Sequence, residues 1–182
     1  MRSYAIVIML VIVAVAVAVG YFLFGSFSDA MPEEDQEIAW IYPATSGMSW
    51  DQFVRGVLRY EGSPEGQAIG LRVNYQRAYL DQTSAVPELV LSRADSEDRL
   101  HIRWYKLTSE TDAAYWVQRF SRMKKPPLAI LGGSTSDRAK DFALALQKAR
   151  EKSARPMPLL LITTATADRV HLLDEADEGP EL

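Results

Sequence analysis

The alternation of short apolar runs with helical patterns, from Ile38 onward, constrains the fold most strongly. Three apolar runs have the length and composition of buried strands, and they occupy Ile38–Tyr42, Leu128–Leu131 and Leu159–Ile162. A further strand is predicted at Leu100–Leu107, where Leu100, Ile102 and Trp104 alternate with the other side chains. Apolar strands separated by amphipathic helices are typical of a parallel sheet covered on both faces. The sequence therefore predicts an α/β fold, a three-layer sandwich with a mainly parallel, Rossmann-like sheet in the order β-α-β-α-β-α-β.

Three segments between these runs repeat apolar residues at helical spacing. The first helix is predicted at Trp50–Arg59, with Ser49 as its N-cap and Gly62 as its stop. The second helix follows a predicted cap at Thr111, and its apolar face comprises Ala113, Trp116, Val117 and Phe120. The apolar face of the third comprises Ala139, Phe142, Ala143 and Leu146.

The stretch from Ser63 to Asp98 is too long for a simple connection. Glu88–Arg93 is predicted to form a hairpin with Leu100–Leu107 through the polar turn Ala94–Arg99, at the edge of the sheet. Leu71–Leu80 is predicted to form a short helix.

A run of twenty residues without charge, Ala5–Phe24, precedes the domain. As a helix it spans about 30 Å, the thickness of a bilayer's hydrocarbon core. Arg2 precedes it and acidic residues follow it, which places the N-terminus in the cytoplasm and the rest outside. The alternative is a signal peptide cleaved near Ser28-Asp29-Ala30. Both interpretations predict an exported, extracytoplasmic domain.

Four parts are therefore expected along the chain. A transmembrane anchor covers residues 1–25, a linker 26–37, the α/β lobe 38–173 and an acidic tail 174–182.

Composition excludes several kinds of site. The chain has no cysteine, two histidines and a net charge of −4. Disulfides and thiolate metal sites are excluded, and a histidine-rich metal centre is not expected. No basic stripe indicates a nucleic-acid partner. We expect no metal and no cofactor.

Hydroxyl side chains follow each predicted strand, where ligands bind in open parallel sheets. The loop Gly132–Ser136 is the best candidate to seat an anion, because a helix N-terminus has free N–H groups and partial positive charge. The alternative is that these hydroxyls only cap helices, as the spacing of Ser134 and Asp137 resembles a capping box. The tryptophans are expected in the core, with Trp50 the exception at the ligand edge.

No catalytic residue is assigned. The Walker A and Rossmann glycine patterns are absent. Gly132–Ser136 differs by its last residue from the G-x-S-x-G nucleophile elbow, which leaves open a hydrolase with Ser134 as nucleophile, His171 as base and Asp168 or Asp174 as its partner. His101 alternates within a strand, which indicates a residue of a sheet face.

Three segments in this order resemble the first lobe of type I periplasmic-binding-protein-like domains, such as the substrate-binding proteins of branched-chain amino acid ABC transporters. They are IAWIYPATSGMSWDQFVRGV, LAILGGSTSDRAKDFALAL and PLLLITTATADRV. The resemblance implies that the Ser/Thr loop holds a ligand carboxylate and that the later turn and the first loop also contact the ligand. By position these residues are Ser134, Thr135, Ser136, then Thr164, Thr166, then Ser46 and Trp50.

The function expected is therefore that of a membrane-anchored, extracytoplasmic, non-catalytic solute-binding lobe. Its ligand would be an amino acid or another small carboxylate. The resemblance implies a transporter permease or a second lobe as partner, because the chain ends after about four strands of the first lobe. A membrane-anchored hydrolase and a ligandless interaction domain remain the alternatives.

Overall fold

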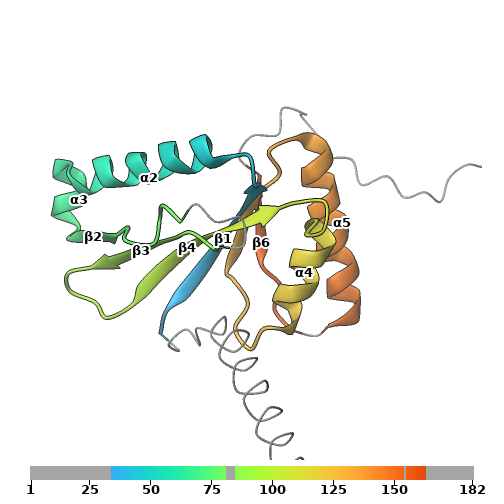
Figure 1. Cartoon of the computed structure of the whole chain (residues 1–182). Helices are drawn as coiled ribbons and strands as arrows, with labels where there is room; N and C mark the ends of the chain where they lie inside the picture. The colour runs from blue at the N-terminus through green and yellow to red at the C-terminus, as the bar shows by residue number, and fades with distance from the viewer. Residues whose placement is uncertain (1–33, 81–84, 154, 163–182) are drawn as a thin grey trace, which may run out of the picture. The chain divides into compact units, whose positions relative to one another are not determined.

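The computed structural model describes residues 34–80, 85–153 and 155–162, which form a six-stranded sheet with helices on both faces (Figure 1). Along the chain the elements are β1 (Gln36–Pro43), α2 (Gly47–Glu61), α3 (Pro64–Ala68), β2 (Leu71–Asn74), β3 (Glu88–Arg93), β4 (Arg99–Leu107), α4 (Ala113–Arg122), β5 (Ala129–Gly132), α5 (Ser136–Lys152) and β6 (Leu159–Ile162).

The strand order is β2-β3-β4-β1-β5-β6. The four strands β4, β1, β5 and β6 are parallel, and β2 and β3 are antiparallel to their neighbours. The predicted mixed α/β class with a mostly parallel sheet is confirmed. The predicted hairpin of β3 and β4 is confirmed as well, with Leu91 opposite Leu100.

Each face of the sheet has its own apolar core. Helix α2 packs on one face, where its Trp50 and Val54 meet Trp40 and Trp104 of the strands. Helices α4 and α5 pack on the other face, and side chains from both helices contribute to one apolar cluster. Figure 1 shows the two helices on the same side of the sheet. The cores follow strand alternation, because successive side chains point to opposite faces of the sheet.

Two expectations about Ser63–Asp98 are wrong or incomplete. Leu71–Asn74 is the edge strand β2 rather than part of a helix, since it pairs with β3 over its whole length. Gly70, with φ at +65°, makes the turn before it, and its carbonyl accepts a hydrogen bond from the Ala94 amide. The five-residue helix α3, capped by the Ser63 side chain, was not expected.

Helix and strand starts also differ from expectation. Helix α2 begins at Gly47, so Ser46 and not Ser49 is its N-cap residue. Asp112, not Thr111, caps α4 through a bond from the Tyr115 amide. Strand β1 begins at Gln36, so the end of the predicted linker belongs to the sheet.

Several expectations concern residues outside the described ranges. The predicted anchor Ala5–Phe24, the acidic tail, Thr164, Thr166 and His171 all lie there. Within the part of the chain that the structure describes, no helix is long and apolar enough to cross a membrane.

Candidate functional site

The parallel strands β4, β1 and β5 end at one edge of the sheet, and their connections leave it on opposite faces. The chain leaves β1 into α2 on one face, whereas β4 and β5 lead into α4 and α5 on the other. A parallel sheet opens a crevice where neighbouring connections diverge in this way. The strand order therefore places the candidate site beyond the carboxyl end of β1.

A cavity of about 220 Å³ lies at this edge, beyond the ends of β1 and β4. The start of α2 and the segments before β3 complete its wall. The lining residues are Ala44, Gly47, Trp50, Asp51, Ala78, Tyr79, Leu80, Pro87, Trp104 and Lys106.

Hydrogen bonds to the backbone fix the two tryptophans of the wall. The indole nitrogen of Trp50 donates to the Ala78 carbonyl at 2.6 Å, and that of Trp104 donates to the Tyr42 carbonyl at 3.3 Å. Both side chains are almost fully buried, and their rings lie 5.9 Å apart. Both N–H groups are therefore used within the protein.

Lys106 brings a positive charge to the wall of the cavity. It follows Ile102 and Trp104 on the same face of β4, is only 8% exposed, and its ammonium lies 5.1 Å from the centre of the Trp104 ring. Its own carbonyl accepts bonds from the Thr111 hydroxyl and the Trp116 indole, which fixes the end of the strand.

The N-terminus of α2 borders the same cavity. The Ser46 side chain makes no capping hydrogen bond, and the first turn of α2 contains no acidic residue. The first N–H groups of a helix have no partner within the helix, and they favour negative charge. Positive potential thus reaches the cavity from both α2 and Lys106.

The predicted loop after β5 is also at this edge, and two of its hydroxyls accept hydrogen bonds from Arg138. Thr135 caps α5 by accepting the Arg138 amide, so the predicted capping pair of Ser134 and Asp137 is wrong by one residue. The Ser134 hydroxyl accepts instead from the Arg138 guanidinium at 2.8 Å. Gly133 has φ at +76°, and a Cβ there would come within 2.8 Å of the Ala139 Cβ.

The predicted ligand residues are therefore divided among three places. Trp50 lines the cavity, but it is 1% exposed and belongs to the core, which corrects its expected exposure. Ser46 lies at the start of α2, and Ser134, Thr135 and Ser136 lie at the start of α5. Thr164 and Thr166 are outside the described residues.

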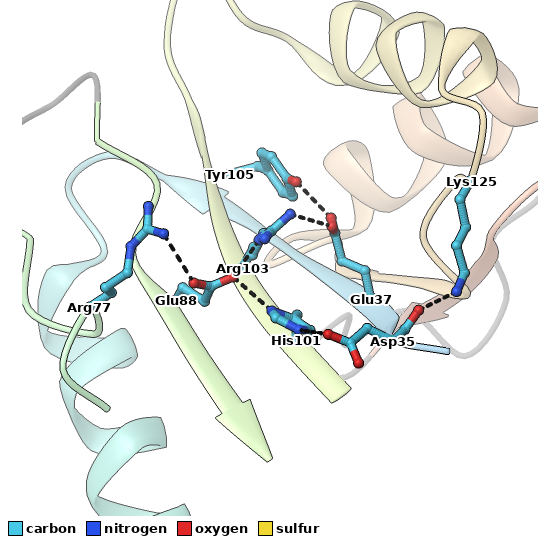
Figure 2. Close-up of polar contacts among 8 residues, drawn as sticks. All are labelled: Asp35, Glu37, Arg77, Glu88, His101, Arg103, Tyr105 and Lys125. Carbon is cyan, nitrogen blue, oxygen red and sulfur yellow. Dashed lines mark hydrogen bonds and ion pairs between the residues drawn. The ribbon is translucent and has the colours of Figure 1, made fainter. Parts of the chain in front are cut away.

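A buried ionic cluster occupies the opposite, amino end of the sheet (Figure 2). We call it the amino-end cluster, and its members are Asp35, Glu37, Glu88, His101, Arg103 and Tyr105. Strand alternation brings His101, Arg103 and Tyr105 to one face of β4, and the acids come from β3 and from the start of β1.

His101 joins two carboxylates in this cluster. Its Nδ1 lies 2.9 Å from Glu88 Oε1, and its Nε2 lies 2.9 Å from Asp35 Oδ2. Both ring nitrogens therefore lie at hydrogen-bond distance from a buried carboxylate. Lys125 donates to the Asp35 carbonyl and joins the loop after α4 to the same point.

The other acids share Arg103. Its Nε donates to Glu88 at 2.7 Å and its Nη1 to Glu37 at 3.0 Å, while the Tyr105 hydroxyl donates to Glu37 at 2.6 Å. Burial acts to raise the pKa of Glu88, but the hydrogen bonds and charges of His101 and Arg103 outweigh it and hold that pKa below its ordinary value of 4.5. Burial and the Glu37 carboxylate raise the pKa of Tyr105 well above its usual range.

The described geometry separates His101 from the predicted nucleophile Ser134. His101 pairs with Glu37 near the start of β1, whereas Leu131, three residues before Ser134, pairs with Trp40. Three residues of strand amount to about 10 Å. His101 is thus a residue of a sheet face, as expected. Among the described residues no group of three or more acids or histidines is placed to hold a metal ion.

Sequence reasoning missed Lys106 and the partners within the amino-end cluster. Lys106 is a lysine on the apolar side of a strand at its carboxyl end, and this position was a usable signal. The acids that meet His101 depend on strand register.

In comparisons with known proteins, no family model, no curated protein and no solved structure matches this chain.

Proposed function

We propose that the domain is a non-catalytic binding lobe for a small carboxylate-bearing solute, held at the carboxyl edge of its parallel sheet. The observation that supports this most directly is the cavity at the start of α2, where an uncapped helix N-terminus and Lys106 both favour negative charge. Its volume of about 220 Å³ is below the usual range for sites that take drug-sized ligands, which suits a small solute such as an amino acid.

The proposal extends to the family and the location of the lobe. The parallel strands β4-β1-β5-β6, with helices on both faces, are compatible with a type I periplasmic-binding-protein-like lobe. The order of the three sequence motifs supports that assignment. The uncharged run Ala5–Phe24 supports a membrane anchor that leaves the lobe outside the cytoplasm.

A second lobe or a transporter permease is the partner proposed. In the family that the sequence resembles, the ligand lies between two lobes. The candidate cavity lies at the edge of the sheet that such a partner would face.

Thermal unfolding of the full chain in mild detergent tests the proposal against a panel of amino acids and monocarboxylates. A ligand that binds only the folded state stabilises it by about 2.7 kcal/mol at one hundred times its Kd. We expect at least one member of the panel to raise the melting temperature in a saturable way. A cooperative transition that no member of the panel shifts would contradict the proposal.

A further inference from the structure

We infer that the amino edge of the sheet, where α4 and α5 end, docks on a lipid surface that carries negatively charged phosphate headgroups. The inference rests on the membrane anchor of the proposed function, and it goes beyond that function because it gives the domain its own contact with the bilayer. We call the docking surface the basic edge. Its members are Arg122, Arg150, Lys152 and Arg155, together with the exposed Leu128 and Leu159.

The topology brings these residues to one end of the sheet. Helices α4 and α5 run antiparallel to the strands that they connect, so their last turns lie at the amino edge (Figure 1). Arg122 belongs to the last turn of α4, and Arg150 and Lys152 belong to the last turn of α5. Arg155 follows in the loop to β6. Since α4 and α5 share one apolar cluster, these exposed charges lie on neighbouring elements.

Positive charge is concentrated at this place although the whole chain has a net charge of −4. Between residues 119–128 and 147–159, Glu151 is the one acid. The turn 94–98 between β3 and β4 lies at the same edge and is acidic. The strand order places β3 and β4 on one side of β1, and β5 and β6 on the other. The amino edge is therefore divided into an acidic half and a basic half.

Complementing the helix dipoles accounts for only part of the basic half. Basic side chains are favoured in the last turn of a helix, but Arg155 lies beyond the end of α5. The dipole also leaves two apolar side chains unexplained, because Leu128 is 52% exposed and Leu159 is 63% exposed. The Leu159 amide donates to the Leu128 carbonyl at 2.9 Å, so these leucines are neighbours. Exposed apolar side chains beside basic ones suit the interface of an anionic bilayer.

The loops that carry the basic edge are fixed by the fold. Lys125, in the loop after α4, donates to the Asp35 carbonyl at the start of β1. Each loop also contains a buried proline, Pro127 in the first and Pro158 in the second. Proline restricts the backbone, and a preordered surface loses less conformational entropy when it binds. These loops therefore present their side chains without rearrangement.

The length of the chain keeps this edge within reach of a bilayer. Strand β1 begins at Gln36, and the bond from Lys125 holds the preceding residue at the amino edge. Ten residues, 25–34, separate that point from the uncharged run Ala5–Phe24. Even fully extended they span at most about 35 Å. A bilayer crossed by the uncharged run is therefore within reach of the basic edge, whereas the cavity lies at the far edge of the sheet.

A fluorescent label tests the docking, because the chain has no cysteine and one introduced cysteine gives one labelled site. Pro156→Cys places the label on the basic edge, and Ser96→Cys places it in the acidic turn of the same edge; both positions are exposed. The full chain is reconstituted in vesicles of phosphatidylcholine, or of phosphatidylcholine and phosphatidylglycerol in equal parts, with a quencher attached to the lipid. We expect quenching of the Pro156→Cys label to be at least about twofold greater in the anionic vesicles. The Ser96→Cys label should show no such difference.

Salt and charge variants identify the cause. The difference should vanish in about 1 M salt, where the Debye length is about 3 Å, and this comparison needs no charge variant. Arg150→Gln/Arg155→Gln should lower the docking equilibrium constant about twenty-five-fold, since each basic residue near an anionic surface contributes about fivefold. Arg55→Gln/Arg59→Gln removes the same charge from exposed positions on α2 and should leave the quenching unchanged.

The outcomes separate this inference from the proposed anchor. If the Pro156→Cys label is quenched equally in both kinds of vesicle, if the Ser96→Cys label responds as strongly, or if the two double variants behave alike, the inference falls and the anchor stands. If inorganic phosphate at constant ionic strength abolishes the difference, the edge binds phosphate ions rather than a lipid surface, and the inference falls. A chain that floats only with anionic vesicles, and only at low salt, contradicts the anchor and supports the basic edge. A chain that floats with neither kind of vesicle contradicts both.

Discussion

Replacing His101 by alanine tests whether the amino-end cluster stabilises the fold. His101 bonds two buried carboxylates at 2.9 Å each, and both acids are at least nine-tenths buried. A hydrogen bond to a charged group contributes about 1.5–3 kcal/mol, so the two bonds together set a ceiling near 6 kcal/mol. Glu88 keeps Arg103 at 2.7 Å and Arg77 at 3.5 Å, which lowers the cost of losing His101.

We therefore expect His101→Ala to lower the free energy of unfolding by about 3 kcal/mol and the melting temperature by about 10 °C. Urea denaturation of the full chain in mild detergent, followed by tryptophan fluorescence, measures the change, since all four tryptophans are buried. Arg99→Ala, at an exposed site on the same strand, is the control and should change stability by less than about 0.5 kcal/mol.

A double-mutant cycle isolates the bond between His101 and Asp35. Combining His101→Ala with Asp35→Asn should give a coupling energy of about 1–3 kcal/mol, the range for residues that share one network. If His101→Ala costs no more than Arg99→Ala, the cluster does not stabilise the fold and the reasoning is refuted.

Three further predictions concern the same fold. Because the pKa of Glu88 is depressed in the folded state, its contribution to the free energy of unfolding is complete above about pH 4.5 and is lost as the pH falls below that value. Urea denaturation at a series of pH values should therefore show a smaller loss of stability below about pH 4.5 in Glu88→Gln than in the unaltered chain. An unchanged loss would contradict the assignment. Tyr105→Phe removes the 2.6 Å bond to buried Glu37 and should cost about 2 kcal/mol in the same assay, whereas a cost near zero would show that Arg103 alone satisfies Glu37. Gly133→Ala should cost about 2 kcal/mol or more in melting experiments, because φ is +76° and the added Cβ meets Ala139; Gly56→Ala, in open space within α2, should be neutral or stabilising, and equal effects would contradict the predicted strain.

The sequence predicts the parallel part of the sheet well, because the apolar runs of β1, β5 and β6 and the alternation of β4 can be recognised locally. Strand β2 could not be recognised, since its four residues are half exposed and owe their conformation to pairing with β3 and to the turn at Gly70. Local pattern has little weight in so short an edge strand.

The residues at the two ends of the sheet could likewise be predicted only in part from the sequence. The carboxyl edge and its hydroxyl loops follow from strand order, which local patterns reveal. The alternation of His101, Arg103 and Tyr105 predicts a polar side of β4, but the partners Asp35 and Glu88 come from strands whose register only the folded chain defines. The burial of Lys106 likewise depends on the packing of α2 and of the segments before β3 around the end of β4.

The most direct test of the central claim is a map of where a small carboxylate binds. Amide and indole chemical shifts of the full chain in detergent micelles would be followed by nuclear magnetic resonance as benzoate is added. We expect the largest changes at the first amides of α2 from Gly47, at Lys106 and at the Trp50 and Trp104 indoles. Saturable changes confined to the amino end of the sheet, or none at all, would contradict a solute site at the carboxyl edge.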